Sequence, residues 1–185
     1  MEMLSAEQIE TLNPFTMEGV LNQVAGVTIN KKQVNIRGGS GFSYGAGSRV
    51  LVLVDGLPML SADAGDIKWN MLPMENAEQI EVVKGASSAM YGASALDGII
   101  NIRTTPPRLK PKTKIMFNYG MYGDPERPEL KHWEKTPMFG RLQLLHARRI
   151  NDLNLVLSTD LFHDQGYLDK VVNTRGKIIS KIEHQ

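Results

Sequence analysis

The stretch that most constrains this chain covers residues 80–104, where two short apolar runs rich in β-branched residues flank a segment of glycine, alanine and serine. The runs, residues 80–83 and 99–102, have the length and composition of strands. Glycine tolerates positive φ and small side chains allow backbones to approach closely, so the segment between the runs predicts a tightly packed loop. We therefore expect two strands joined by this loop, and nothing in the stretch resembles a catalytic centre.

Length, charge and cysteine content bound the class of protein. The chain of 185 residues is long enough for one compact domain plus an extension. Its 21 basic and 20 acidic residues give a net charge of +1, which offers no electrostatic basis for binding nucleic acid. The absence of cysteine excludes disulfides and thiolate metal sites. The N-terminus lacks the pattern of a secretory signal peptide, and no window holds the roughly 20 apolar residues of a membrane-spanning helix.

The first half of the chain has the pattern of an α+β domain. Ser5 and Gln8 match a capping box that opens a short helix, and an apolar stripe over residues 16–24 predicts a second one. Residues 27–29 and 34–36 alternate on either side of a polar turn, which predicts a hairpin.

A glycine-rich segment, residues 38–48, could be mistaken for a phosphate-binding loop. Such loops need a helix directly after the glycines, or a Gly-Lys-Ser/Thr sequence. Neither follows here, because residues 50–54 have the pattern of a buried strand. That strand ends on Asp55, as in some phosphoryl-transfer enzymes, but Leu53 stands where a second metal-binding acid would be needed. Asp55 and Gly56 are better interpreted as a turn.

The loop over residues 57–70 carries candidate binding groups. Asp63, Asp66 and Trp69 lie on it, and loops held by a rigid scaffold often carry binding residues. The alternative is that both aspartates are solvated turn formers. A single helical turn that begins near Pro73 is expected next.

The second half predicts a set of period-two strands. A stiff proline-rich connector, residues 106–113, separates it from the first half. Residues 114–185 then hold about four strands, joined by a long loop and a tight turn. Long loops on one side and short turns on the other are typical of transmembrane β-barrels, which need about eight strands or more, so these strands cannot close by themselves. The four histidines have no metal-ligand spacing, and no metal or cofactor is predicted.

Several short motifs follow one another in a fixed order. They are Val-Ala-Gly-Val at 24–27, Val-Asn-Ile-Arg-Gly at 34–38, Arg-Val-Leu-Val-Leu-Val-Asp-Gly-Leu-Pro at 49–58, Gln-Ile-Glu-Val-Val-Lys-Gly-Ala-Ser-Ser-Ala-Met-Tyr-Gly at 79–92 and Gly-Ile-Ile-Asn-Ile at 98–102. In this order and spacing, residues 5–104 resemble the plug domain of TonB-dependent outer-membrane receptors. Residues 114–185 look like the opening strands of that family's barrel.

The resemblance implies a fold and a function. The fold is α+β, with a globular plug of short helices and a small mixed sheet over residues 1–105, followed by about four antiparallel strands of an incomplete β-barrel. The function is the gate and ligand-binding part of an active transporter in the outer membrane of a Gram-negative bacterium. Its cargo would be a scarce nutrient such as an iron complex, haem, cobalamin or glycan. No bond is broken, so the protein is not expected to be an enzyme.

The resemblance also assigns site residues. Arg37 and Lys84 would be latch residues that face glutamates on the barrel wall, although Lys84 stands where the family usually has arginine and gives a point charge in place of a bidentate fork. The ligand would be faced by Met59, Asp63, Asp66 and Trp69. The plug signature consists of Gly38, Asp55, Gly56, Gly85, Tyr91, Gly92, Gly98 and Asn101.

Parts of the family's pattern are not expected in these residues. They are the TonB box, the first plug strand, a signal peptide and most of the barrel. TonB would therefore be a partner of the full-length protein only, together with the nutrient ligand, the remaining barrel and outer-membrane lipid. The 185 residues alone should not transport, and they should self-associate through exposed strand edges and an apolar face.

A self-standing soluble binding or adhesion domain is the alternative, with the four strands as its own sheet. Leu153, Leu155, Leu157 and Leu161 distinguish the two hypotheses, because they face lipid in the receptor and form a core in the soluble domain. A phosphoryl-transfer enzyme that uses Asp55 is a third hypothesis, which the lack of converging carboxylates disfavours.

Overall fold

The chain folds into two compact units, Met1–Thr105 and Pro106–Gln185. The structure is a computed structural model that describes residues 1–12, 16–30, 32–39, 42–43, 47–61, 65–85, 91–167 and 171–184. The boundary between the units falls at the first residue of the proline-rich segment. Among the described residues, no helix is long and apolar enough to cross a membrane.

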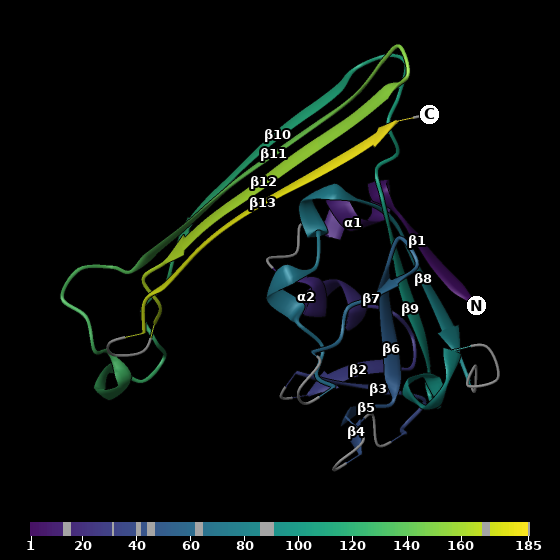
Figure 1. Ribbon diagram of the computed structural model, residues 1–185. Coiled ribbons are helices and arrows are strands. Elements are labelled where there is room, and N and C mark those ends of the chain that lie inside the picture. The colour runs from purple at the N-terminus through teal and green to yellow at the C-terminus, as the bar shows by residue number, and fades with distance from the viewer. Residues whose placement is uncertain are drawn as a thin grey trace. The chain divides into compact units, whose positions relative to one another are not determined.

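The first unit is built on a five-stranded mixed sheet with the strand order β1-β8-β9-β6-β7 (Figure 1). Its strands are β1 (Glu2–Ser5), β6 (Val50–Val54), β7 (Leu57–Pro58), β8 (Ala77–Lys84) and β9 (Gly98–Thr104). β9 is antiparallel to β8 and parallel to β6. The two apolar runs of the 80–104 stretch are thus adjacent strands at the centre of the sheet, as predicted. Residues 86–90 of the loop between them lie outside the described part of the chain.

β6 is buried on both faces because its sequence is apolar at every position. Val50 and Val52 point to the main core, whereas Leu51 and Leu53 pack with Ile99 in a smaller cluster on the opposite face. The single-turn helix η3 (Ala93–Ala95) contributes Ala95 to that smaller cluster. A continuous apolar run, in place of an alternating one, therefore places β6 inside the unit.

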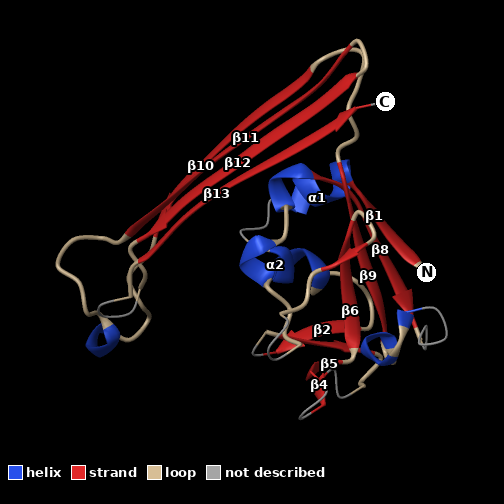
Figure 2. Cartoon of the chain, in the orientation of Figure 1, coloured by secondary structure: helices blue, strands red, loops and turns tan. Residues whose placement is uncertain are grey.

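Two short helices, α1 (Ala6–Leu12) and α2 (Met17–Leu21), lie on one face of the sheet (Figures 1 and 2). The predicted capping box forms, since the Ser5 amide donates to Gln8 Oε1 over 2.9 Å and the Gln8 amide donates to Ser5 Oγ over 3.4 Å. The Thr16 side chain caps α2 by accepting from the Gly19 amide. The main core between helices and sheet includes the completely buried Val20, Leu21, Ile80, Val82, Ile100 and Ile102. Burial of each such side chain contributes about 1.5–3 kcal/mol.

Short elements surround the sheet. β2 (Val27–Asn30) and β3 (Gln33–Ile36) form the predicted hairpin, and β4 (Phe42–Ser43) pairs with β5 (Gly47–Ser48) within the glycine-rich segment. β5 leads into β6 without a helix between them. Single helical turns occur at η1 (Trp69–Met71) and η2 (Met74–Asn76), the second of which follows Pro73 as expected.

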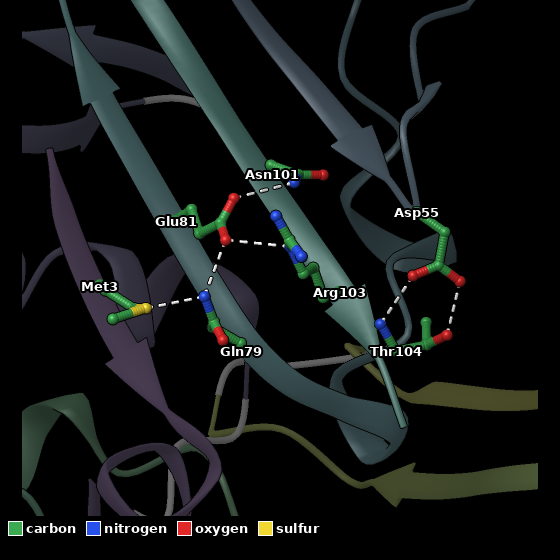
Figure 3. A network of polar contacts seen from close by, with 7 residues as sticks. All are labelled: Met3, Asp55, Gln79, Glu81, Asn101, Arg103 and Thr104. Carbon is green, nitrogen blue, oxygen red and sulfur yellow. Dashed lines mark hydrogen bonds and ion pairs between the residues drawn. The ribbon is translucent and has the colours of Figure 1, made fainter. Parts of the chain in front are cut away.

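Asp55 and Gly56 form the two-residue turn between β6 and β7, with φ values of 49° and 83°. The Asp55 carboxylate accepts hydrogen bonds from the Thr104 amide over 2.8 Å and from the Thr104 hydroxyl over 2.6 Å (Figure 3). The acid at the end of β6 therefore ties this turn to the end of β9.

β1 is an element that the sequence did not lead us to expect. It pairs with residues 79–82 of β8 and forms one edge of the sheet, whereas a plug without its first strand was predicted. Leu4 packs against the main core, and pairing satisfies backbone groups of β8 that would otherwise lie at an open edge. A strand of four residues is too short to show period-two alternation, so tertiary pairing decides its conformation.

The second unit contains four long strands in one antiparallel sheet, in chain order (Figures 1 and 2). They are β10 (Lys112–Met121), β11 (Met138–Ile150), β12 (Leu153–Asp164) and β13 (Asn173–His184). A long connection containing η4 (Pro128–Leu130) joins β10 to β11, and a tight turn at Asn151–Asp152 joins β11 to β12. The long and short connections thus lie at opposite ends of the sheet, as predicted.

The two faces of this sheet differ in polarity. The strand registers place a set of apolar side chains on one face, with exposed fractions between 37 % and 72 %: Ile115, Phe117, Tyr119, Leu142, Leu157, Leu161, Ile178 and Ile182. On the other face Arg141 pairs with Asp160 through two hydrogen bonds of 2.7 Å, and both side chains are buried. Apolar residues on the outward face and polar residues on the inward face are typical of outer-membrane barrel strands.

We expect Gly98→Ala to destabilise the first unit by about 2–4 kcal/mol, a cost typical of a backbone clash at a special φ. Gly98 has a φ of 152°, and a Cβ at this position would overlap the Val83 carbonyl oxygen and lie 2.9 Å from Ile36 Cδ1. Urea unfolding followed by Trp69 fluorescence, in a Trp133→Phe background, measures the effect. Gly38→Ala is the matched control, because its φ is 75° but a Cβ there meets nothing within 4 Å. Equal losses in the two variants would contradict the steric explanation.

Candidate ligand pocket and the Lys84 clip

The segment over residues 59–71 is held in shape by its own hydrogen bonds. The Ser61 amide donates to the Asp66 carbonyl over 2.8 Å, and the Asp66 amide donates to Ser61 Oγ over 3.0 Å. A β-bridge pairs Leu60 with Ile67. These contacts close the segment on itself, so its side chains are presented from a defined backbone.

Trp69 joins this segment to the β2–β3 hairpin. Its indole Nε1 donates to the Lys32 carbonyl over 2.8 Å, and the side chain is only 5 % exposed. Lys32 lies at the turn of the hairpin with a φ of 68°, a left-handed conformation that is unusual outside glycine. One hydrogen bond thus brings together two loops that are distant in the sequence.

A pocket of about 560 Å³ lies where the two loops meet. It is lined by Lys32, Gln33, Asp66, Ile67, Lys68, Trp69, Asn70 and Met71. Its volume falls within the range of small-molecule sites, which combine apolar walls with a few converging polar groups. The arrangement is suited to reversible binding, and no cluster of three or more metal-ligating side chains occurs among the described residues.

The pocket includes part of the predicted ligand-facing set. Asp66 and Trp69 line it, whereas Met59 is half-buried against the main core and Asp63 lies outside the described residues. The lining residues that sequence reasoning missed are Lys32, Gln33, Lys68, Asn70 and Met71. The polar hairpin turn was visible in the sequence, but nothing there indicated that it lies beside Trp69.

Lys84, one of the predicted latch residues, ends β8 and contacts two groups of the first unit. Its ammonium lies 2.5 Å from Glu2 Oε2 and 2.5 Å from the Ala25 carbonyl oxygen. We call this three-way contact the Lys84 clip, because it ties β1 to β8 and to the segment before β2. The hydrogen bond from Lys84, with its charge, holds the pKa of the Glu2 carboxyl below its ordinary value.

Arg37, the other predicted latch residue, follows β3 with a φ of 54°. Its amide donates to the Gly26 carbonyl over 2.8 Å, which closes the hairpin, and its side chain is exposed. The guanidinium has no ion-pair partner in the part of the chain that the structure describes. The two latch candidates therefore differ, since one is engaged within the first unit and the other extends from it.

The signature residues serve structural roles in turns and in a polar network. Gly38, Gly85 and Gly92 adopt positive φ, and Tyr91 is 44 % exposed. Figure 3 shows the network around Glu81 on β8, whose carboxylate accepts from Gln79, Asn101 and Arg103 over 2.7 to 3.1 Å. Gln79 also contacts the Met3 sulfur, so the network extends across β1, β8 and β9.

The first unit is a mixed-sheet domain with a pocket, and the second is an antiparallel sheet that separates apolar from polar side chains, as outer-membrane barrel strands do. Residues 1–99 match the family model for the TonB-dependent Receptor Plug Domain, which is more than half of the chain. The chain therefore belongs to the TonB-dependent receptor family. The proteins of this family are outer-membrane receptors of Gram-negative bacteria, and the relatives are transporters and receptors, not enzymes.

Named relatives and solved structures agree with this assignment. The chain is 37 % identical over 124 residues to the vitamin B12 transporter BtuB of Vibrio vulnificus, a match that covers 64 % of the chain and 19 % of the transporter. The vitamin B12 transporter BtuB of Vibrio cholerae is 34 % identical over 120 residues, a match that covers 64 % of the chain and 20 % of that transporter. The chain spans about a fifth of the length of these relatives.

Solved receptors share the fold. The siderophore receptor PirA of Pseudomonas aeruginosa superposes with a TM-score of 0.73 at 22 % identity, over 100 % of this chain and 32 % of PirA. The unliganded ferric citrate transporter FecA gives a TM-score of 0.76 at 16 % identity, over 99 % of this chain and 28 % of FecA. Both superpositions extend over the first and the second unit, so the fold agrees with the plug and incomplete barrel expected from the sequence.

The lowered pKa of Glu2 gives the Lys84 clip a pH dependence. The clip stabilises β1 while Glu2 is ionised and is lost as the pH falls through the lowered pKa. We expect amide hydrogen exchange in β1 to accelerate in acid, and Lys84→Met to give the fast exchange already at neutral pH. Glu2→Gln should remove the pH dependence, whereas Glu7→Gln, an exposed acid in α1, should retain it. Unchanged β1 exchange in Lys84→Met would show that the ammonium does not hold β1.

Proposed function

We propose that this chain is the plug and ligand-binding part of a TonB-dependent outer-membrane transporter for a scarce nutrient. The observation that carries the proposal is the pocket formed by the hairpin turn and residues 66–71, within a domain of the plug family. Two of the residues expected to face the ligand, Asp66 and Trp69, line that pocket. The BtuB relatives carry vitamin B12, and the solved relatives include siderophore and ferric citrate receptors.

The proposed mechanism is binding followed by loosening of the gate, with no covalent step. The ligand would lie between the two loops, whose relative position is fixed by the hydrogen bond from the buried Trp69 to the Lys32 carbonyl. Passage of the nutrient through the receptor requires that TonB remodel the plug inside a complete barrel, and TonB is a partner of the whole receptor. The edge strand β1 is suited to early release, because it is short and pairs with the sheet along one side only.

The latch proposal takes a modified form. Arg37 extends from the first unit as a cation available to a carboxylate of the barrel wall, as the family resemblance implies. Lys84 would reach the wall only after β1 moves, because Glu2 and the Ala25 carbonyl hold its ammonium. The hydrogen-exchange experiment on Lys84→Met tests whether Lys84 holds β1 before it reaches the barrel wall. If Lys84 were bound to another partner from the start, the substitution would leave amide exchange in β1 unchanged.

Ligand binding by the whole chain in detergent micelles is the direct test. We expect at least one of cyanocobalamin, ferric enterobactin and ferric citrate to quench Trp69 fluorescence saturably in the Trp133→Phe background. Trp69→Phe with Trp133 retained is the control for quenching unrelated to the pocket. If none of the three probes gave a saturable change, the assignment of the pocket to nutrient binding would fail.

The second unit supports an outer-membrane location over the soluble alternative. Leu153, Leu157 and Leu161, which would form the core of a soluble domain, are 40 %, 37 % and 47 % exposed. They share their face with other large apolar residues on all four strands. An apolar face of this extent marks contact with lipid or with another protein surface.

Arginine on this face should therefore weaken binding to phosphatidylcholine vesicles. Phe117 and Ile178 are 71 % and 72 % exposed, and we expect Phe117→Arg/Ile178→Arg to reduce vesicle partitioning at least tenfold, because arginine in the bilayer midplane costs about 2–4 kcal/mol. Leu130→Arg, at a leucine that is 52 % exposed in the loop before β11, is the matched control. If the unsubstituted chain were monodisperse and did not bind vesicles, the result would favour the soluble binding or adhesion domain.

A further inference from the structure

We propose that the pocket selects a ligand that carries net negative charge on oxygen atoms, such as an anionic carboxylate complex of iron, over a neutral ligand. This inference rests on the proposed function, since it assigns a substrate class to the same pocket. It is carried by the charges that line the pocket and by how their backbones are held.

Two cations and one anion line the pocket. Lys32 and Lys68 make no ion pair within the described part of the chain, and the Asp66 carboxylate makes none there either. Some lysines elsewhere in the chain do pair with acids, as Lys84 does with Glu2 and Lys131 with Asp124. Among the described residues, the side chains that line the pocket therefore carry a net charge of +1 that no ion pair offsets.

The two lysines belong to the two different loops that line the pocket. Lys32 extends from the hairpin turn, whose backbone is held by the hydrogen bond from Trp69, and Lys68 precedes Trp69 on the other loop. A ligand between the loops would therefore lie near one lysine from each loop. Because the backbones are already positioned, binding would order only the lysine side chains, which limits the entropic cost.

The remaining lining groups suit an oxygen-rich ligand with some apolar surface. Gln33 adds an amide group that can donate to ligand oxygens. Met71 is 60 % exposed and supplies a flexible thioether surface beside the buried Trp69. Asp66 opposes an anion, so the balance of two lysines against one aspartate sets the preference.

Titration of Trp69 fluorescence in the Trp133→Phe chain tests the preference, with ferric citrate as the anionic probe and cyanocobalamin as the neutral one. We expect Lys32→Gln/Lys68→Gln to weaken ferric citrate binding about tenfold or more, the effect of losing two charge-assisted contacts. Asp66→Asn should tighten it about two- to fivefold, because a repulsive charge is removed. Both effects should shrink as the salt concentration rises.

Lys110→Gln/Lys135→Gln is the matched control. It removes two exposed lysines outside the pocket and changes the net charge of the chain equally, from +1 to −1. Equal weakening in both double variants would overturn the inference, as would saturable binding of cyanocobalamin without binding of ferric citrate. In that second case the proposed function would stand. If none of cyanocobalamin, ferric enterobactin and ferric citrate bound saturably, both the charge preference and the proposed function would be overturned.

Discussion

The close approach of β8 and β9 at Gly98 is the constraint on which the first unit depends. Only a residue without Cβ allows pairing to begin there, since the Val83 carbonyl and Ile36 occupy the space that a side chain would need. β9 then carries β6 on its other edge, and the alternate residues of these strands form the core that α1 and α2 cover. The 80–104 stretch therefore organises the unit through backbone geometry and burial, without any reactive group.

The pocket and the Lys84 clip both depend on the β2–β3 hairpin. Trp69 holds the turn of the hairpin through the Lys32 carbonyl, and Lys84 holds the carbonyl of Ala25, two residues before the first hairpin strand. The same lysine also holds Glu2 on the edge strand. The hairpin is thus held at its turn by Trp69 and at its start by Lys84, in both cases through hydrogen bonds to backbone carbonyls.

In the second unit, the alternation of apolar and polar residues is enough to specify the register of the strands. Alternation alone assigns the apolar and polar faces, because a shift of one residue in register would exchange them. Removing one partner of the Arg141–Asp160 pair would leave a buried charge uncompensated, so the pair penalises registers that separate its two members. This explains why the second unit could be predicted from the sequence with few corrections.

By itself the sequence determined the capping box at Ser5, the hairpin, the turn at Asp55, the central strands and the period-two sheet, because each depends on neighbouring residues or on local periodicity. Only the tertiary structure decided the rest. β1 is a strand because β8 offers it an edge, Lys84 meets Glu2 across 82 positions of sequence, and Lys32 reaches the pocket through a contact with Trp69 across 37 positions. The local sequence pattern does not predict such contacts, because they form only when burial of the core brings distant segments together.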